Sequence, residues 1–570
     1  MQTNNLKDNT FDAIVIGSGI SGGWAAKELC EKGLKTLVIE RGRMVKHVKD
    51  YPTAMLDPWE FDHRNTKTKK MIDDNPTISK HYAFDESTKD FYINDALHPY
   101  IQEKPFDWIR GYQVGGKSLL WARQTQRWSD YEFEGPKRDG FAVDWPIRHA
   151  DLAPWYSHVE TFVGISGNRD GLSNLPDSEV LPAFEMNVVE KQLKKNINEA
   201  FPDRPVIMGR CAHITQPNDI HLQQGRAKCM ARSLCQRGCP FGAYFSSNAS
   251  TLPWAEKTGN LTIKPNTVVH SIIYDEKLGK ATGVKTIDAH TKEEVIYHAR
   301  IIFVNGSTLN TNLILLNSRS NKFPKGLGNL NGLLGHYIAF HNYRGRITAT
   351  VDGFEDSYYY GRRPTQLFMP SFRNVYKQET DFLRGYMIAF SANREGWNKP
   401  TDGIGAQFKD HLTEVGSWSV SMMMQGETVP IYENHVRLSE HQKDQWGVPL
   451  LITSVEYTEN DDKVLNDFLR EGATMLEKAG CKNIKTTDQK AIGYRNPGLE
   501  VHEMGGVRMG HDPETSLLNK WNQLHHCKNV FITDGACMTS TGNQNPSLTY
   551  MALTARAANY AADEWKKGRL

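Results

Sequence analysis

Apolar and polar positions form their clearest pattern in the first forty residues of the chain. An apolar run at 11–16 predicts a buried strand, 24–32 has helical character and ends before Gly33, and 36–40 predicts a second strand. A strand, a helix and a strand in this order predict a βαβ unit, in which parallel strands form a sheet with helices on its faces. The chain is therefore expected to have an α/β fold.

Three later segments extend this picture. Residues 261–304 are rich in strand patterns, with turn signals at 275–276 and 288–289. Residues 548–565 predict an Ala-rich amphipathic helix that returns to the first domain. Residues 44–105 show little periodicity, which predicts excursion loops that include a lid.

The middle of the chain follows a different pattern. Aromatic and polar positions alternate from about 336 to 460, for example at 337–340 and 418–422. Alternation of this kind is typical of strands that bury one face only. We therefore expect an antiparallel sheet in a second domain.

Composition excludes several classes of protein. Lys and Arg number 68 and Asp and Glu 66, a net charge of +2, so electrostatics give no reason to expect nucleic acid or an anionic membrane as partner. No apolar run reaches the length of a membrane span. The polar start, 1–10, is expected to carry no export signal.

A glycine fingerprint connects the first predicted strand to the helix. Gly17-Ser18-Gly19-Ile20-Ser21-Gly22 has the form G-x-G-x-x-G, and Glu40 follows 18 residues after Gly22. Such a turn brings backbone N–H groups and a helix N-terminus to a pyrophosphate, and the distal acid accepts from ribose hydroxyls. The pattern predicts a dinucleotide site, the alternative being a glycine turn without ligand. It does not choose between NAD and FAD.

Further motifs follow in chain order. They are Glu40-Arg41-Gly42, the segment 110–121 (RGYQVGGKSLLW), 260–269, the segment 502–510 (HEMGGVRMG), Asp534-Gly535 and 545–549 (NPSLT). Together with the fingerprint, this set resembles the glucose–methanol–choline (GMC) oxidoreductase family. The resemblance spans nearly the whole chain and is loosest between 336 and 500.

The resemblance implies a Rossmann-like FAD-binding domain and a substrate domain built on an antiparallel sheet with helices. The first would comprise 1–60, 106–135, 205–335 and 500–570. The second, with the lid, would comprise 61–105, 136–204 and 336–499.

The same resemblance implies FAD as cofactor. Family members that attach FAD covalently have a histidine where this chain has Leu120, so the flavin should be non-covalent. The residues expected to bind FAD are Gly17, Ser18, Gly19, Ile20, Ser21, Gly22, Glu40, Arg41, Arg110, Gly115, Gly116, Ser118, Trp121, Val269, Asp534, Gly535, Asn545 and Pro546.

His502 and Asn545 stand where the family has its catalytic His/His or His/Asn pair. Removing a hydride from a carbinol needs a base for the hydroxyl proton, and a histidine titrates near neutral pH. A second polar side chain must hold the alcohol oxygen. We therefore assign His502 as base and Asn545 as its orienting partner. His511, His525 and His526 are expected to be surface or loop residues.

Three cysteines cluster at Cys229, Cys235 and Cys239, with Pro240 after the last. Thiolates suit iron–sulfur clusters and zinc, and three of them without a fourth ligand favour a [3Fe–4S] cluster. The spacing resembles that of FAD sugar dehydrogenases with such a cluster, although Met230 follows the first cysteine where relatives can have another cysteine. The alternatives are a disulfide with a free thiol, or three reduced cysteines in a core.

The function expected from the resemblance is dehydrogenation of a sugar or glycoside hydroxyl, such as C3 of a glucoside. Electrons would pass through the cluster to a cytochrome or quinone. A small companion subunit would carry the chain to the periplasm; otherwise it would be cytoplasmic. The alternatives are an oxidase that uses dioxygen with structural cysteines, a non-redox lyase on the same fold, and, ranked last, an electron-transfer or binding module.

Overall fold

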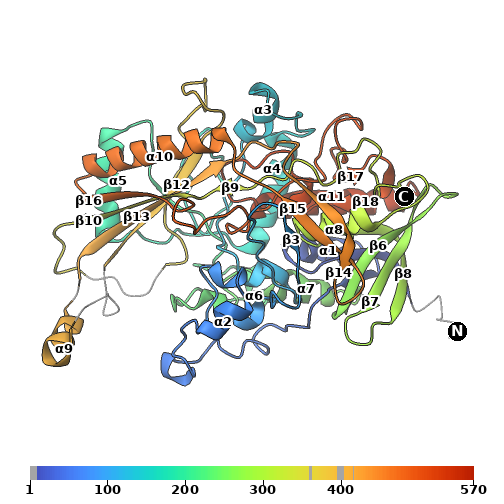
Figure 1. Ribbon diagram of the computed structural model, residues 1–570, viewed down its shortest axis with the longest axis horizontal. Helices are drawn as coiled ribbons and strands as arrows, with labels where there is room; N and C mark the ends of the chain where they lie inside the picture. Colours follow the sequence, from blue (N-terminus) through green and yellow to red (C-terminus); the bar gives the residue numbers. More distant parts are fainter. Residues whose placement is uncertain (1–8, 358–362, 395–402, 415) are drawn as a thin grey trace.

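The computed structural model describes residues 9–357, 363–394, 403–414 and 416–570. The first eight residues, for which no export signal is expected, lie outside this range. Figure 1 shows two sheets at opposite ends of the molecule, with helices α5 (Val188–Ala200) and α10 (Glu459–Lys478) beside one and α1 (Ile20–Glu31) beside the other.

The first sheet contains the predicted βαβ unit. Its order is β17-β18-β8-β1-β2-β5, in which β1 pairs in parallel with both β2 and β8, while β6 and β7 extend it as antiparallel hairpins. Its strands are β1 (Thr10–Ile16), β2 (Thr36–Ile39), β5 (Leu261–Lys264), β6 (Thr267–Asp275), β7 (Lys280–Asp288), β8 (Glu294–Val304), β17 (Gln523–Leu524) and β18 (Cys527–Ile532).

Two helices cover one face of this sheet. Ala25 and Leu29 of α1 share a buried cluster with Ala558 and Ala562 of α11 (Ser547–Lys566) and with Val15 of β1. The small side chains let both helices approach the sheet closely. The C-terminal helix therefore returns to the first strand, as the sequence predicts.

The second sheet is antiparallel throughout, and two helices cover one of its faces. Ile347, Ile388 and Met422 point from three adjacent strands into a core with Leu193 of α5 and Phe468 of α10. The sheet has the order β16-β10-β13-β12-β11-β4, with β9 beside β13. Its strands are β4 (Ile207–Met208), β9 (His341–Asn342), β10 (Gly345–Val351), β11 (Leu367–Met369), β12 (Tyr386–Arg394), β13 (Trp418–Glu427) and β16 (Lys482–Asp488).

A third, small sheet and several short helices complete the described chain. The sheet has the order β14-β15-β3, from His435–Lys443, Pro449–Ser454 and Ile101–Gln102. The remaining helices are α2 (Lys69–Asp74), α3 (Asp130–Arg138), α4 (His149–Val163), α6 (Asp219–Gln223), α7 (Thr251–Glu256), α8 (Thr308–Asn317) and α9 (Gly405–Thr413), with 3-10 turns at Pro58–Glu60, Ile78–Lys80, Lys89–Phe91, Gly116–Leu119, Cys235–Arg237, Ser247–Ala249 and Gly535–Cys537.

Most predicted elements are confirmed, and one is wrong. The βαβ unit, the hairpins in 261–304, the strand at 418–422 and the C-terminal helix are all present. Residues 337–340 are not a strand, because only His336 and Ala339 make isolated bridges there. Their alternation reflects packing instead: the Phe340 ring lies edge-on against Tyr457, at 5.1 Å between centroids.

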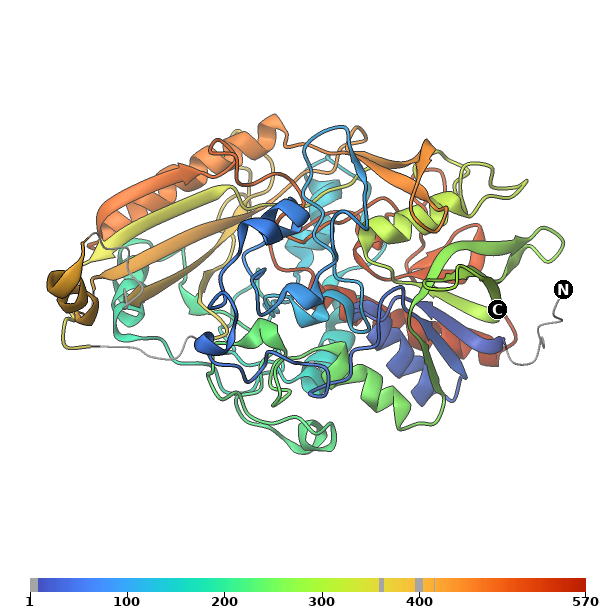
Figure 2. The ribbon, with the colours of Figure 1, turned by 60° about the horizontal axis from the view of Figure 1, so that its bottom comes forward.

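The loop-rich segment 44–105 crosses the middle of the molecule between the two larger sheets (Figure 2). It contains only short helical turns and the two residues of β3, as the missing periodicity predicts. The division into two domains with the stated boundaries, and the role of this segment as a lid, stay predictions.

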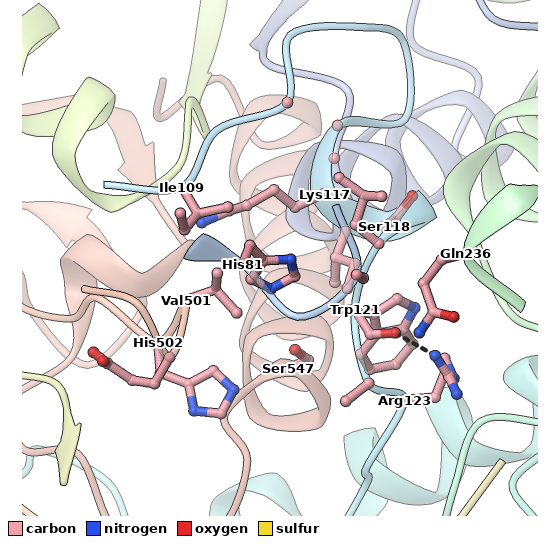
Figure 3. Close-up of a pocket in the computed structure, with 18 of the residues that line it drawn as sticks. His81, Ile109, Lys117, Ser118, Trp121, Arg123, Gln236, Val501, His502 and Ser547 are labelled. Atoms are coloured by element: carbon pink, nitrogen blue, oxygen red, sulfur yellow. Dashed lines mark hydrogen bonds between the residues drawn. The ribbon is translucent and has the colours of Figure 1, made fainter. Parts of the chain in front are cut away.

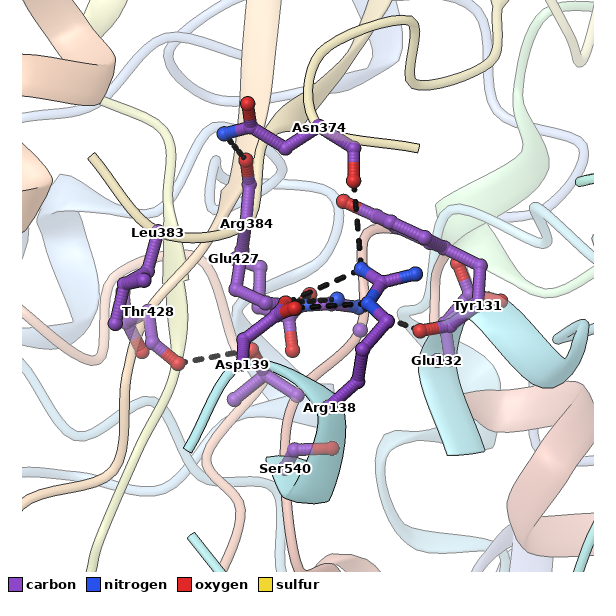
Figure 4. Close-up of polar contacts among 12 residues, drawn as sticks. Tyr131, Glu132, Arg138, Asp139, Asn374, Leu383, Arg384, Glu427, Thr428 and Ser540 are labelled. Carbon is purple, nitrogen blue, oxygen red and sulfur yellow. Dashed lines mark hydrogen bonds and ion pairs between the residues drawn. The ribbon is translucent and has the colours of Figure 1, made fainter. Parts of the chain in front are cut away.

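A buried ion-pair network joins α3 to the second sheet (Figure 4). Arg384 is fully buried and donates through Nε to Glu427, through Nη1 to Asp139 and through Nη2 to the carbonyl of Tyr131, each at 2.8 Å. Its guanidinium also stacks on the Tyr131 ring at 4.0 Å. One cation thus compensates two carboxylates in the interior, which would otherwise carry a large desolvation penalty.

Replacing Arg384 with Met should destabilise the fold. Glu427 would lose its cation in a fully buried site, whereas Asp139 keeps Arg138 at 2.8 Å. Removing one partner of a buried pair costs about 3–5 kcal/mol. Thermal unfolding followed by circular dichroism should show a midpoint several degrees lower. As a control, Lys482→Ala removes the exposed pair with Asp352 and should leave the midpoint almost unchanged. Equal midpoints for Arg384→Met and the parent would contradict this role.

Candidate active site

A cavity of about 880 Å³ extends from the glycine turn of the first sheet to the second sheet. Figure 3 shows side chains from several segments pointing into it, among them His81, Lys117, Trp121 and His502. Of the residues predicted from sequence, it is lined by Gly17, Ser18, Gly19, Ile20, Ser21, Glu40, Arg41, Arg110, Gly116, Ser118, Trp121, Val269, Cys235, His502, Asp534, Gly535 and Asn545. Gly22, Gly115, Pro546, Cys229 and Cys239 do not line it.

The three fingerprint glycines have different tasks. Gly17 has φ 90°, and a Cβ there would lie 2.3 Å from the carbonyl oxygen of Asn305. A Cβ on Gly22 would lie 1.9 Å from the carbonyl oxygen of Gly17, so this glycine allows the helix to pack on the turn. A Cβ on Gly19 would meet nothing within 4 Å. Gly19 therefore leaves open space at the N-terminus of helix α1.

Glu40 and Arg41 come from the end of β2. One carboxylate oxygen of Glu40 accepts from the Ser18 hydroxyl at 2.6 Å and from the Ser18 backbone N–H at 3.2 Å, so Glu40 braces the glycine turn. Arg41 is held by Asp444 at 3.0 Å and stacks on the rings of Tyr112 and Trp446. The Glu40 carboxylate keeps free lone pairs that can accept from further donors.

The segment 110–121 forms the next part of the wall. Gly115 has φ 94°, and its N–H donates to the Ser18 hydroxyl at 2.9 Å, which ties this loop to the glycine turn. Trp121 donates through Nε1 to the carbonyl of Phe245 at 2.9 Å. Lys117 forms an ion pair with Glu503 at 3.2 Å, next to His502 in sequence. The loop therefore connects the fingerprint with the segment around His502.

Asp534 has two roles in the structure. It lines the cavity, and its carboxylate accepts from the backbone N–H of Ala536 at 3.0 Å and from the hydroxyl of Thr311 at 2.6 Å. The first contact caps the short 3-10 turn that follows. Burial raises the pKa of Asp534 to about 6. The cap is thus observed, and contact with a cofactor stays a prediction.

His502 and Asn545 meet at the far end of the cavity. Asn545 Nδ2 lies 3.4 Å from His502 Nε2, although the residues are 43 positions apart in sequence. On its other side, His502 Nδ1 lies 2.9 Å from Nδ1 of His341. Burial is the main cause that holds the pKa of His502 well below its usual value, with smaller contributions from His341 and Lys117. His502 is therefore neutral near neutral pH and able to accept a proton.

Several residues around this pair were missed by sequence reasoning. Tyr343 donates to the Gln425 side chain, and its ring lies 5.8 Å from that of His502. Glu500 is buried beside them, and burial raises its pKa to about 8. His341 begins strand β9 and Tyr343 follows that strand, while Gln425 lies in β13 inside the second sheet. Only the tertiary fold brings them to His502.

The second sheet presents polar side chains to the cavity, among apolar ones that include Phe368, Met387 and Met423. Arg346 of β10, Ser391 and Asn393 of β12 and Gln425 of β13 line it, while their neighbours along each strand face the core. Arg346 donates to the hydroxyl of Ser421, and Arg495, which also lines the cavity, donates to Gln489. Within the described ranges neither guanidinium forms an ion pair. Both can therefore donate to a guest in the cavity.

The cavity suits FAD by its donors and its shape. Buried polar atoms without a protein partner lie on residues of its wall, including Nε of Arg110, Nδ2 of Asn305, Oδ1 of Asn545 and the hydroxyl of Tyr550. Buried polar groups normally find partners, so these atoms favour a polar guest. The open space at Gly19, at the start of a twelve-residue helix, fits a pyrophosphate.

The cysteine cluster is not supported as a metal site. In the part of the chain that the structure describes, no three His, Cys, Asp or Glu side chains are grouped to hold a metal ion. Between the cysteines the chain turns at Ala231 and Ser233, with positive φ, and at Gly238. The loop still forms one wall of the cavity through Cys235.

The other interpretations of these cysteines can also be compared with the structure. All eight cysteines lie in the described residues, and each is free, so no disulfide forms. Cys229, Cys235 and Cys239 are half-buried, which separates them from the five cysteines in the core.

Two models of GMC oxidoreductases match residues 92–338 and 430–554, together more than half of the chain. The chain belongs to the GMC oxidoreductase family. It is therefore an FAD-dependent enzyme that acts on alcohol groups, with the mixed α/β fold of that family.

Relatives of the GMC family align with almost the whole chain. The 2-methyl-1,2-propanediol dehydrogenase of Mycolicibacterium austroafricanum is 28% identical, over 96% of this chain and 94% of the relative. The fructose dehydrogenase large subunit of Gluconobacter japonicus is 24% identical, over 98% of each chain. The crystal structure of pyridoxine 4-oxidase from Mesorbium loti superposes with a TM-score of 0.59 at 14% identity, covering 96% of this chain and 98% of that one.

Among the described helices of the chain, none combines the length and the apolar character needed to cross a bilayer.

Gly19→Ala should reduce flavin binding without unfolding the protein. The added methyl group meets no protein atom, so its only clash is with a group seated at the helix N-terminus. We expect the purified variant to retain a clearly smaller fraction of flavin by visible absorbance, while its apoprotein melts at the parent's temperature. Full flavin occupancy in this variant would contradict a pyrophosphate at Gly19.

Proposed function

We propose that this GMC enzyme is a dehydrogenase that oxidises a hydroxyl group of a sugar or glycoside, with C3 of a glucoside as one candidate position. The observation that carries the proposal is that His502 and Asn545 face the same cavity as the glycine turn. A base, an orienting amide and a dinucleotide site thus share one enclosed space.

The polar wall of the second sheet supports a substrate with many hydroxyl groups. Arg346, Arg495 and Gln425 offer side-chain donors on the side of the cavity near His502. An alcohol with a single hydroxyl could accept from few of these donors, whereas a polyol gains further hydrogen bonds there, at about 0.5–1.5 kcal/mol each. Fructose and a propanediol are named for the two relatives above, which agrees with this preference.

His502 would act as the base. Its Nε2 would take the proton of the substrate hydroxyl, and Asn545, 3.4 Å away, would hold the same oxygen so that the C–H bond points to the hydride acceptor. Bound FAD supplies that acceptor, because its oxidised flavin takes the hydride. The low pKa of His502 keeps the ring neutral before the substrate binds.

The cofactor would be held non-covalently. Gly17 to Gly22, Glu40 and Arg41 would bind the adenosine and pyrophosphate parts, and the segment 110–121 would lie along the flavin. Leu120 offers no nucleophile for a covalent link, and its side chain is buried.

Electrons would leave to an external acceptor such as a cytochrome or quinone. The loop 229–239 is a candidate path for these electrons. It forms a cavity wall through Cys235 and reaches the surface at Met230, which is 60% exposed. A [3Fe–4S] cluster in that loop would carry the electrons along this path, but the arrangement of the thiols does not favour such a cluster. The reaction at His502 does not depend on it.

A small companion subunit and a periplasmic location belong to the same proposal. One relative is named as the large subunit of a fructose dehydrogenase, which supports an assembly with other chains. A cytoplasmic enzyme that works alone is the alternative.

Anaerobic mixing with sugars tests the function. Glucose, a methyl glucoside, gluconate and fructose should include at least one compound that bleaches the flavin, whereas cyclohexanol should not, because it offers the polar wall only one hydroxyl. His502→Ala should slow bleaching by about 10²–10⁴-fold at unchanged flavin content. Failure of every sugar and polyol would reject the proposal, and conversion of a substrate without bleaching would favour a lyase.

The same preparation separates the electron acceptors. Iron near zero with rapid peroxide release on exposure to air would identify an oxidase with structural cysteines. About three irons per chain would support the cluster despite the thiol arrangement. Iron content is the readout because the optical bands of the cluster would overlap those of the flavin.

A further inference from the structure

His341 lies behind His502, on the side away from the cavity. Its Nδ1 is 2.9 Å from Nδ1 of His502, and the two rings stand nearly perpendicular with centroids 5.0 Å apart. His341 is fully buried and begins strand β9, at the edge of the second sheet. Nothing in the sequence marks it, because neither its neighbours nor its spacing form a motif.

Two backbone carbonyls determine which nitrogen of His341 carries its proton. Nε2 lies 3.1 Å from the carbonyl oxygen of Thr541 and 2.9 Å from that of Gly542. Carbonyl oxygens only accept, so Nε2 must be the protonated nitrogen. Burial lowers the pKa of His341 to about 4, and the ring is therefore neutral, with a lone pair on Nδ1.

That lone pair determines the protonation of His502. Two ring nitrogens 2.9 Å apart need one proton between them, and His341 has none to give at Nδ1. The proton must therefore belong to Nδ1 of His502. Neutral imidazole carries a single N–H, so Nε2 of His502 is left with its lone pair. The amide Nδ2 of Asn545, a donor, lies on that same nitrogen at 3.4 Å.

We propose that His341 is a positioning residue that fixes the proton of His502 on Nδ1 and so presents the unprotonated Nε2 to the substrate. This inference rests on the proposed role of His502 as base. In the reaction, the hydroxyl proton of the substrate forms a bond to Nε2, while the Nδ1–H bond of His502 stays intact and continues to donate to His341. The positive charge of the resulting imidazolium is then stabilised by the neutral His341 lone pair.

Two substitutions separate this role from a purely structural one. Asn carries its amide oxygen near the position of Nδ1, whereas Gln carries its amide near the position of Nε2. His341→Asn thus keeps an acceptor for His502 and loses the contact with Thr541 and Gly542. His341→Gln keeps the donor to those carbonyls and loses the acceptor.

Rapid-mixing measurement of anaerobic flavin reduction, with the best polyol substrate, tests the pair. We expect His341→Gln to lower the limiting reduction rate at least about tenfold and to change its pH profile, while His341→Asn stays within about threefold of the parent. Flavin content and apparent substrate affinity should be similar in both. The reverse order, with the Gln variant near the parent and the Asn variant impaired, would show that His341 only anchors the 541–542 backbone and would overturn the proposal.

Neutron diffraction from crystals of the holoenzyme provides a second readout that needs neither folded variants nor a known substrate. A hydrogen on Nδ1 of His502 and on Nε2 of His341 is the expected result. A hydrogen on Nε2 of His502 in the resting enzyme would overturn the proposal. If no polyol bleaches the flavin, the proposed function fails, and this neutron result still decides the inference about the tautomer.

Discussion

The backbone of residues 541–545 is the constraint on which the rest of the site depends. This segment runs directly into helix α11, which packs on the first sheet, and it is held by side chains of the second sheet. His341 donates to its carbonyls at 541 and 542, and Gln425 donates to the carbonyl of Asn543 at 2.7 Å. One buried loop therefore sets the position of both sheets relative to Asn545.

This constraint explains why the dinucleotide site and the catalytic pair come from different parts of the fold. The glycine turn and Glu40 are built by local βαβ geometry, and the Gly115 N–H ties the next loop to Ser18. The base, its amide partner and the polar wall depend on the contact between sheets. An enclosed cavity with donors on one side and a helix N-terminus on the other is what hydride transfer from a polyol to a bound dinucleotide requires.

The sequence predicted the parts of the site whose geometry is local or carried by a motif. Gly17 and Gly22 could be assigned because a strand–turn–helix needs glycine where backbone atoms approach closely. His502 and Asn545 could be paired only through the family motif. His341 could not be found, because its strand reaches His502 through long-range sheet packing.

One sequence expectation fails and a second lacks support, because spacing along the chain does not determine direction in space. The alternation at 337–340 predicts a strand, and the side chains are instead distributed by core packing. The spacing of Cys229, Cys235 and Cys239 predicts a three-iron site, and the described residues contain no group of three such side chains placed to hold a metal ion. By contrast, the α/β fold, the antiparallel second sheet and the family were all confirmed.

The most direct test of the central claim is a deuterium isotope effect on anaerobic flavin reduction. A reactive sugar would be deuterated at the carbon that bears the oxidised hydroxyl and compared with the unlabelled sugar in rapid mixing. Hydride transfer from that carbon in this cavity predicts slower bleaching by a factor of several, in both the parent and Asn545→Ala. Equal rates for the labelled and unlabelled sugars in both proteins would contradict the account.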